Sequence, residues 1–394
     1  NLRIAVLSPS VNRRRGTERA VAELVARLVR EHGCEVHLYA QEVEDIEVTQ
    51  WPQADASERG RVVWHRVARI PGPHLFQFIH WLAVNRIARW RDRWIHGLHC
   101  DAVFSPGINA LDADVVLVHA VFHRLKLLQD ARGGGGLRGL HRSMYYRLLC
   151  WLESRVYRRK LLRLAAVSRH TARQLDEYFG RTDVNVIPNG VDTVHFSPAN
   201  RDALRVEVRE RLGYSRGDIV LLLVGNDFRN KGLPVLLEAV KLCGKLQLKV
   251  CVVGEDALAT GLVSSARSQL EGRIRFAGET RDILSFYSAA DIYTAPSLED
   301  SFNLPALEAM ACGLPVVVSR NAGISEYLRD GENGVLLQDA ADPDELAEAL
   351  SRIASNPGVA EGIGAEAVST AAELSWDRHA KALLQLIQSA KEDA

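Results

Sequence analysis

The chain has 394 residues, of which 47% are hydrophobic and 25% charged, and its formal net charge is zero. This length exceeds what one core usually supports, so two domains are expected. The composition is that of a soluble globular protein and excludes fibrous and disordered classes. No apolar run approaches the roughly 18 residues that a membrane-spanning helix needs.

The zero net charge hides an asymmetry between the two halves. Residues 1–190 carry 29 Lys and Arg against 19 Asp and Glu, a net of +10, whereas residues 191–394 carry 20 against 30, a net of −10. The reversal of sign supports a domain boundary near residue 190, and the basic first half favours an anionic partner. The six cysteines are scattered without any metal-ligand spacing. They predict a reducing compartment, the cytoplasm.

The first half reads as alternating strands and helices. Arg3–Leu7 is a short apolar run, and Glu18–Glu31 carries apolar residues at helical spacing. Gly33 is expected to end that helix. Further strand-like runs are Glu35–Tyr39, Ala102–Phe104, Val115–Val118, Leu164–Val167 and Asn185–Ile187.

The second half repeats this alternation. Its expected strands are Ile219–Val224, Lys249–Val253, Ile274–Phe276, Ile292–Ala295 and Pro315–Ser319. Its expected helices are Pro234–Leu242, Ile283–Ala289 and Pro343–Ala354. Such alternation predicts an α/β fold of two doubly wound, Rossmann-like domains, with parallel sheets covered on both faces. Ligands of such sheets bind at the carboxyl ends of the strands.

The turn-rich segment Ile187–Asp192 is the expected linker between the domains. The predicted organisation is therefore a first domain at residues 1–190 and a second at 191–372. Residues 373–394 are expected to form a final helix that crosses back onto the first domain.

The segment from Pro296 to Pro315 carries the clearest chemical signal. A strand ends near Pro296, and Asn303 is a suitable N-cap for a short helix over Leu304–Cys312, with Gly313 after its end. The N-terminus of such a helix offers free N–H groups and a positive dipole end, which suits a pyrophosphate. Two acids, Asp300 and Glu308, stand eight positions apart and are placed to hold sugar hydroxyls at two points of one ligand.

This segment resembles glycosyltransferase family 4, whose members share an acidic-x7-acidic pattern followed by Ala-Met-Ala-x-Gly-x-Pro. The resemblance implies the two-domain GT-B fold with a central cleft. It also implies that Glu308 accepts the ribose hydroxyls of a nucleotide and that Asp300 contacts the donor sugar. The loop amides that would cradle sugar and phosphate map to Ser301, Phe302, Asn303 and Leu304. The family usually has Glu where this chain has Asp300.

A second segment, Val224–Gly232, resembles the family's Val-Gly-x5-Lys-Gly. The resemblance implies that Gly225 lets the backbone approach the ligand and that Lys231 binds the diphosphate. Many members carry Arg where Asn226 stands, and Arg229 is the candidate substitute. The sequence around residues 227–228 resembles most closely that of the lipopolysaccharide core glucosyltransferases.

Weaker matches complete the expected site. Gly254, Glu279 and Thr280 follow strands of the second half, and by resemblance they line the base pocket. In the first half, Gly16 stands where the family's backbone approaches phosphate and acceptor. A solvated loop is the alternative there, and it extends to the basic run Arg13-Arg14-Arg15.

His119 resembles the family's sugar-contacting histidine, with His123 as its competitor and a packed core histidine as the alternative. Asp112-Ala113-Asp114 imitates the Asp-x-Asp metal motif of a different glycosyltransferase fold, but its surroundings do not fit that fold. We expect neither a metal nor a cofactor.

The acceptor side is suggested by aromatic and basic stripes. On a helix through residues 83–94, Ala83, Ile87, Trp90 and Trp94 share one face, beside Arg86, Arg89 and Arg93. A second basic cluster contains Arg155, Arg158, Arg159, Lys160 and Arg163, after Tyr145, Tyr146 and Trp151. Such stripes suit an anionic membrane surface at the inner face of the cytoplasmic membrane. The alternative is that the tryptophans belong to the core and the arginines are solvated.

Together these features predict a retaining hexosyltransferase. It would move a sugar from a nucleotide-diphosphate sugar, with UDP favoured, to a hydroxyl of a lipid-linked or lipopolysaccharide-type glycan. No nucleic acid is expected as a partner. Two alternatives stay open, a GT-B-fold nucleotide-sugar epimerase and a catalytically silent nucleotide-sugar-binding protein, because residues 15 and 226 depart from the family's pattern.

Overall fold

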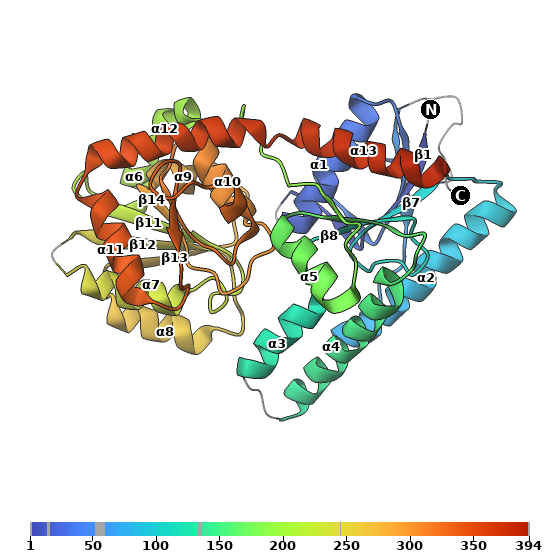
Figure 1. Cartoon of the computed structure of the whole chain (residues 1–394), viewed down its shortest axis with the longest axis horizontal. Helices are drawn as coiled ribbons and strands as arrows, with labels where there is room; N and C mark the ends of the chain where they lie inside the picture. Colours follow the sequence, from blue (N-terminus) through green and yellow to red (C-terminus); the bar gives the residue numbers. More distant parts are fainter. Residues whose placement is uncertain (1, 14–15, 52–59, 133–135, 245, 393–394) are drawn as a thin grey trace. The chain divides into compact units, whose positions relative to one another are not determined.

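A computed structural model describes residues 2–13, 16–51, 60–132, 136–244 and 246–392 of the chain. It divides into two compact units, Asn1–Pro188 with Trp376–Ala394, and Asn189–Ser375. Each unit is a parallel β-sheet with helices packed around it (Figure 1), which confirms the predicted α/β class with two Rossmann-like domains.

The first unit contains an eight-stranded sheet in the order β10-β9-β8-β7-β1-β3-β6-β5, and its strand pairs are all parallel. The strands are β1 (Arg3–Leu7), β3 (Glu35–Ala40), β5 (Thr49–Gln50), β6 (Val62–Arg66), β7 (Ala102–Pro106), β8 (Val115–Val118), β9 (Arg163–Ala166) and β10 (Asn185–Val186). A separate short pair joins β2 (Ser10–Val11) to β4 (Glu42–Val43). The helices are α1 (Gly16–Arg30), α2 (His74–Ile95), α3 (Phe122–Arg132), α4 (Gly136–Tyr157), α5 (Arg169–Phe179) and α13 (Trp376–Glu392).

The second unit contains a six-stranded parallel sheet in the order β13-β12-β11-β14-β15-β16. The strands are β11 (Ile219–Val224), β12 (Leu248–Val253), β13 (Ile274–Gly278), β14 (Ile292–Ala295), β15 (Val316–Ser319) and β16 (Val335–Leu337). The helices are α6 (Pro198–Leu212), α7 (Leu233–Leu242), α8 (Thr260–Gln269), α9 (Ile283–Ala289), α10 (Leu304–Ala311), α11 (Pro343–Ala354) and α12 (Pro357–Glu373), with a 3₁₀ turn at Gly323–Tyr327.

The central strands of the second unit are apolar because both faces of the sheet are covered there. In β11 the residues Val220–Leu223 are all buried, and β15 is buried from end to end. A buried guanidinium group also holds the segments that lead into two of these strands. Arg209 of α6 donates to the carbonyls of Ala289 at 2.8 Å and Asp218 at 2.7 Å and to the carboxylate of Asp291 at 3.0 Å. It thereby fixes the entries to β11 and β14.

The last helix, α13, belongs to the first unit, where it packs on α1. Its buried stripe includes Trp376, Leu383 and Ile387. His379 lies on the same stripe, and its Nδ1 donates to the carbonyl of Pro188 at 2.8 Å. Arg27 of α1 pairs with Asp377 at 2.6 Å. The chain therefore returns to its first unit through apolar packing supported by a few polar contacts.

Several histidines of the first unit are buried without charge. His37 Nδ1 and His65 Nε2 lie 2.8 Å apart, and His65 Nδ1 donates to the carboxylate of Asp92 at 2.7 Å. Burial lowers the pKa of both His37 and His65. Burial also lowers the pKa of His379 to about 4, despite its bond to Pro188. At neutral pH these side chains are therefore neutral hydrogen-bonding groups.

These depressed pKa values make the first unit acid-labile. The unfolded imidazole takes up a proton near its usual value of about 6.5, whereas the native ones stay neutral. The unfolded state therefore binds more protons as the pH falls from about 6.5 toward 4, and stability is lost over that window. His379, whose pKa lies at about 4, should by itself remove roughly 2 kcal/mol of unfolding free energy between pH 6.5 and 5. All seven tryptophans lie in the first unit, so urea unfolding followed by tryptophan fluorescence measures it selectively.

Two variants separate this effect from a general acid sensitivity. His379→Asn should flatten the dependence of the urea midpoint on pH, whatever it does to the midpoint at pH 7. His74→Asn, at an exposed position, should leave the wild-type slope unchanged. An identical slope in His379→Asn and the wild type would contradict the assignment.

Candidate functional site

The second sheet changes direction between β11 and β14. From β11 the chain builds outward through β12 and β13, and it then returns to the other side of β11 with β14, β15 and β16. At such a switch point the loops that leave adjacent strands diverge, so the carboxyl end of a parallel sheet opens there to a ligand. The two loops concerned, residues 225–232 after β11 and 296–303 after β14, are the two segments with the clearest sequence motifs.

Lys231 and Asp300 meet across this switch point. The ammonium nitrogen of Lys231 lies 2.5 Å from a carboxylate oxygen of Asp300, and the two side chains are 19% and 12% exposed. The other oxygen of Asp300 accepts from the backbone N–H of Phe302 at 3.3 Å. A cation and an anion thus lie side by side at the carboxyl end of the sheet, and solvent can still reach each of them.

Close backbone approach holds the two loops in place. Gly232 has φ 80°, and a Cβ there would lie 2.0 Å from the carbonyl oxygen of Pro296. The side-chain amide of Asn230 donates to the carbonyl of Glu299 at 2.7 Å, and the N–H of Leu298 donates to the carbonyl of Asn230 at 2.8 Å. The separation of Lys231 from Asp300 is therefore fixed by backbone contacts and does not depend on their ion pair alone.

Two further glycines make room beside Lys231. A Cβ at Gly225 would lie 2.7 Å from the Lys231 stem, and one at Gly254 would lie 2.1 Å from the carbonyl oxygen of Gly225. The side-chain carbonyl of Asn226 accepts from the N–H of Glu255 at 3.2 Å. The ends of β11 and β12 are therefore packed backbone against backbone, and the lysine stem lies on this glycine surface.

Helix α10 begins immediately after Asp300. Its N-cap, Asn303, has φ 75°, and its side-chain oxygen accepts from the N–H of Ala306 at 3.0 Å and from the hydroxyl of Tyr293 at 2.9 Å. Pro305 occupies the first turn, where it needs no donor. The helix start and its cap agree with the sequence prediction, and the helix ends at Ala311, one residue before the predicted end. The support from Tyr293, a buried residue of β14, has no local sequence signal.

Glu308 lies one turn inside α10 and is 3% exposed. One of its carboxylate oxygens accepts from the hydroxyl of Tyr287 at 2.8 Å. Tyr287 belongs to α9, and its ring is fully buried. This second tyrosine orients the acid, and sequence reasoning missed it because residue 287 is distant in the chain from residue 308 and reads as an ordinary core aromatic.

The other predicted residues of the second unit surround this centre. Arg229 is exposed in the loop after β11, two residues before Lys231. Glu279 and Thr280 follow β13, whose end is joined to that of β12 by the N–H of Gly254, which donates to the carbonyl of Gly278 at 2.9 Å. Ser301 and Leu304 bracket the entrance to α10. The structure therefore groups the predicted donor-binding residues of the second half at the ends of four adjacent strands, β13, β12, β11 and β14.

Gly16 and His119 belong to the first unit. Gly16 is the first residue of α1, and Arg14 and Arg15 lie outside the described residues. His119 follows β8, and neither of its ring nitrogens has a hydrogen-bond partner within the described part of the chain. Burial, and then the nearby His379, lowers the pKa of His119 to about 3. Its imidazole is therefore neutral, and both ring nitrogens are buried.

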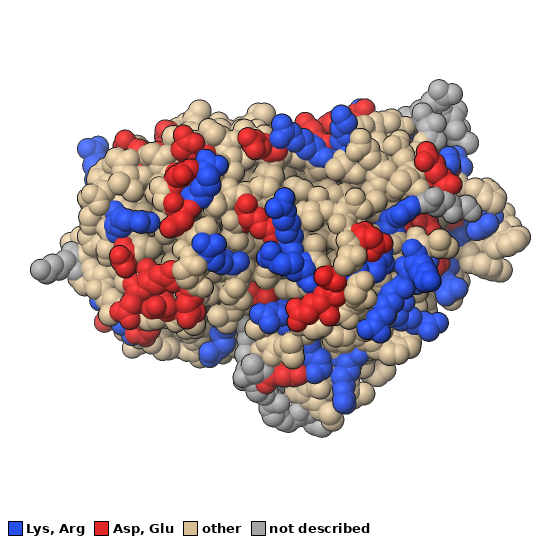
Figure 2. Space-filling view, in the orientation of Figure 1, with Lys and Arg blue, Asp and Glu red and all other residues tan. Residues whose placement is uncertain are grey.

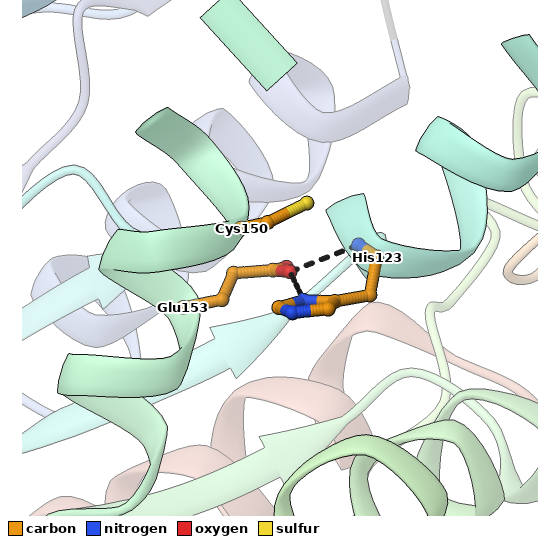
Figure 3. A group of neighbouring side chains, drawn as sticks. All are labelled: His123, Cys150 and Glu153. Atoms are coloured by element: carbon orange, nitrogen blue, oxygen red, sulfur yellow. Dashed lines mark hydrogen bonds and ion pairs between the residues drawn. The ribbon is translucent and has the colours of Figure 1, made fainter. Parts of the chain in front are cut away.

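His123, the competing histidine, is already engaged. Its Nδ1 donates to the carboxylate of Glu153 at 2.8 Å, and the same carboxylate accepts from the backbone N–H of His123 at 3.1 Å (Figure 3). The carboxylate also accepts from the backbone N–H of Phe122 at 2.7 Å. Glu153 thus caps α3 from α4. Cys150 lies beside them, and the three side chains form a group with metal-ligand spacing. Burial raises the pKa of the Cys150 thiol to about 11, which disfavours the thiolate that a metal requires. The arrangement fits a helix cap better than a metal centre, and it favours His119 as the ligand-facing histidine.

The two aspartates of the Asp-x-Asp sequence are likewise held in contacts within the fold. Asp112 pairs with Arg89 at 2.7 Å, and the carboxylate of Asp114 accepts from the N–H of Val103 at 2.8 Å. Both carboxylates therefore hold the segment that leads into β8.

Across the described ranges no helix is long and apolar enough to cross a membrane.

Comparison with known proteins gives the same division of the chain. A family model described as Glycosyltransferase Family 4 matches residues 14–195, and one described as Glycosyl transferases group 1 matches residues 218–356. Among curated proteins, the chain is 36% identical over 255 residues to a D-inositol 3-phosphate glycosyltransferase of Thermomonospora curvata, covering 58% of this chain and 57% of the relative. A protein of the same name from Thermobifida fusca is 34% identical over 244 residues, covering 58% and 55%. The chain thus spans little more than half the length of these relatives.

Solved structures share the fold over the whole chain. The glycosyltransferase WaaG, described as involved in lipopolysaccharide biosynthesis, superposes with a TM-score of 0.77 at 18% identity, covering 98% of this chain and 99% of that one. The sucrose-phosphate synthase of Thermosynechococcus elongatus gives 0.76 at 19%, with full coverage of both. Anabaena HepE, in complex with UDP and glucose, gives 0.71 at 19%, covering 99% and 100%. The fold is GT-B, the two family models account for most of the sequence, and the chain belongs to the group 1, family 4 glycosyltransferases.

Proposed function

We propose that this protein is a retaining glycosyltransferase that transfers a hexose from a nucleotide-diphosphate sugar to a hydroxyl group of a glycan acceptor. The observation that carries the proposal is the Lys231–Asp300 pair across the β11–β14 switch point, with the oriented Glu308 next to it. A site that binds a nucleotide sugar needs a cation for the diphosphate and acceptors for sugar and ribose hydroxyls. These three side chains supply that set.

In this proposal the ligand divides the ion pair. Lys231 turns to the diphosphate, where a point charge suits phosphate oxygens, and Asp300 accepts hydroxyls of the sugar. Lys231 exchanges the carboxylate for the phosphate charges, and Asp300 exchanges the ammonium for hydrogen bonds from hydroxyls. Backbone N–H groups at the N-terminus of α10 add donors to the same phosphates. Glu308, held by Tyr287, accepts from the ribose.

The transfer step needs charge stabilisation more than a dedicated base. The bond between the anomeric carbon and the phosphate oxygen breaks, and the acceptor oxygen bonds to the same carbon from the same face. The acceptor proton moves to the leaving phosphate oxygen. Lys231 and the α10 amides would stabilise the developing charge on the diphosphate. His119, neutral near pH 7, offers a hydrogen bond to the sugar without adding a charge.

The donor and acceptor follow from different considerations. A UDP-sugar is favoured, and HepE, which shares the fold, has been solved with UDP and glucose. For the acceptor we propose a lipid-linked or lipopolysaccharide-type glycan on the basic first unit. The relatives named D-inositol 3-phosphate glycosyltransferases favour a second candidate, an inositol phosphate, because the same basic unit suits a small anion. Assaying both acceptor types with one donor distinguishes them.

Incubation with UDP-, GDP- and ADP-sugars tests the proposed activity itself. Slow hydrolysis of one donor, and faster release of its nucleotide when an acceptor is present, are the expected results. A changed sugar on an intact nucleotide would indicate the epimerase. Binding of a donor without any turnover, in the presence of both acceptor types, would indicate the silent binder.

Removal of the Lys231 charge should affect turnover more than folding. Lys231→Gln is expected to lower kcat/KM for donor turnover by about 10²–10³-fold, because a preorganised charge on the leaving group is lost. Lys241→Gln, at an exposed lysine of α7, is the matched control and should retain wild-type turnover. Arg229→Gln measures whether that arginine contributes. Undiminished turnover in Lys231→Gln would remove this residue from the mechanism.

The acid of α10 should determine donor affinity. Glu308→Ala is expected to weaken UDP-sugar binding by about 100-fold, the value of charge-assisted hydrogen bonds to two ribose hydroxyls. Tyr287→Phe should raise the dissociation constant by about fivefold with kcat nearly unchanged, because it removes one hydrogen bond that orients the carboxylate. Tyr214→Phe, elsewhere in the same unit, serves as the control. Isothermal titration calorimetry with UDP measures all three. Equal affinity of Glu308→Ala and the wild type would refute the site.

A further inference from the structure

Helix α2 has an inverted distribution of polarity. Its buried residues are Trp81, Asn85 and Asp92, of which two are polar. Asp92 accepts from the hydroxyl of Tyr39 at 3.0 Å and from His65, and Asn85 donates to the carbonyl of Trp81 at 2.6 Å. A helix that only packs on its own sheet presents apolar residues inward and polar residues outward. Helix α2 departs from this pattern, because its inward face combines Trp81 with Asn85 and Asp92 while other large apolar residues stay exposed.

The outward side of α2 carries a continuous apolar stripe. At about 100° per residue, the residues on this side fall within one narrow sector opposite Asn85 and Asp92. They are Phe76, Ile79, Ala83, Ile87, Trp90 and Trp94. Ile87, Trp90 and Trp94 are 63%, 60% and 69% exposed. The exposed aromatic stripe predicted from the sequence is therefore confirmed for Trp90 and Trp94, and the alternative that these tryptophans belong to the core is wrong. Because α2 has 22 residues, the stripe extends over about 30 Å.

Helix α4, which packs against α2 where Phe78 meets Tyr145, has a similar outward face. Its exposed apolar residues are Leu140, Met144 and Trp151, and Arg147 and Arg155 alternate with them at helical spacing. The Arg155 guanidinium lies 5.9 Å from the centre of the Trp151 ring. We call the outward faces of α2 and α4 the Trp–Arg surface.

The charge of the Trp–Arg surface has one sign. Arg86 and Arg93 flank the stripe on α2, both exposed. The acidic residues of these two helices are Asp92 and Glu153, and both are fully buried. Figure 2 shows basic side chains gathered over the region where Figure 1 draws α2 and α4. Exposed tryptophans beside arginines, with no exposed carboxylate on either helix, define the chemistry of the partner. Such a partner has a negatively charged surface with an apolar layer just beneath it.

We propose that the Trp–Arg surface docks on an anionic lipid bilayer, with α2 lying in the plane of the interface. Tryptophan suits the boundary between acyl chains and headgroups, and arginine reaches the anionic headgroups beside it. A second copy of this chain fits less well. A symmetric pairing of the surface with itself would bring arginines against arginines without a compensating acid.

Vesicle flotation tests this proposal with the full chain. The wild type should float with phosphatidylglycerol-containing vesicles at low salt and stay unbound with pure phosphatidylcholine. Near an anionic membrane each arginine contributes about fivefold to partitioning. Arg86→Glu/Arg93→Glu should therefore lower the partition coefficient at least roughly 25-fold. Trp90→Gln/Trp94→Gln should also reduce the quenching of tryptophan fluorescence by brominated lipid, leaving the part that Trp151 contributes.

A matched control comes from the second unit. Leu258→Gln/Arg216→Glu changes an exposed apolar residue and an exposed arginine there and should bind vesicles like the wild type. UDP-sugar binding should be the same in all of these proteins, so the result does not depend on the proposed enzymatic activity. Failure of the wild type to float with anionic vesicles at low salt would overturn the proposal. So would a tryptophan-dependent dimer in light scattering without vesicle binding, or a control that loses binding as fully as the α2 variants.

Discussion

The donor-side architecture depends on the close approach of two backbones. Gly232 passes so near the carbonyl of Pro296 that any Cβ there would collide with it. This contact brings the loop after β11 against the loop after β14 at the switch point of the sheet. Lys231 precedes the contact in one loop, and Asp300 follows it in the other. The position of the cation relative to the anion is therefore set by main chain, which moves less than a long side chain does.

This constraint explains why the second unit was readable from the sequence. A site built from backbone contacts needs glycine at 225, 232 and 254, a proline in the first helical turn and an N-capping asparagine, and each leaves a local signal. The strands Ile219–Val224 and Ile292–Ala295 and the helices Ile283–Ala289 and Pro343–Ala354 were predicted with the bounds that the structure has. β16 was missed because its three residues are too short for a pattern to emerge.

The residues that the sequence did not reveal act across long intervals. Tyr287 and Tyr293 support Glu308 and Asn303 from other elements, and a buried tyrosine has the same local pattern whether or not its hydroxyl orients an acid. The first unit was harder to read for a related reason. Its helix α2 faces the protein with Asn85 and Asp92 as well as Trp81, so the sequence pattern alone left open whether Trp90 and Trp94 belong to the core. The network of His37, His65 and Tyr39 that satisfies Asp92 is assembled from two strands, β3 and β6, and has no motif.

The inversion of α2 and the buried acids are physically connected. Trp90 and Trp94, which are exposed, do not attach α2 to its own sheet, so Trp81 and polar contacts must hold the helix. The carboxylate of Asp92, buried with hydrogen bonds from Tyr39 and His65, provides a directional attachment that apolar packing would otherwise supply. Glu153 does the same for α4, where it caps α3 from the inward side. Sequestering both acids inside also leaves the outward faces uniformly basic. The two buried carboxylates anchor α2 and α4 and are at the same time absent from the surface. The net positive charge of residues 1–190 is therefore concentrated on the faces that carry the outward tryptophans.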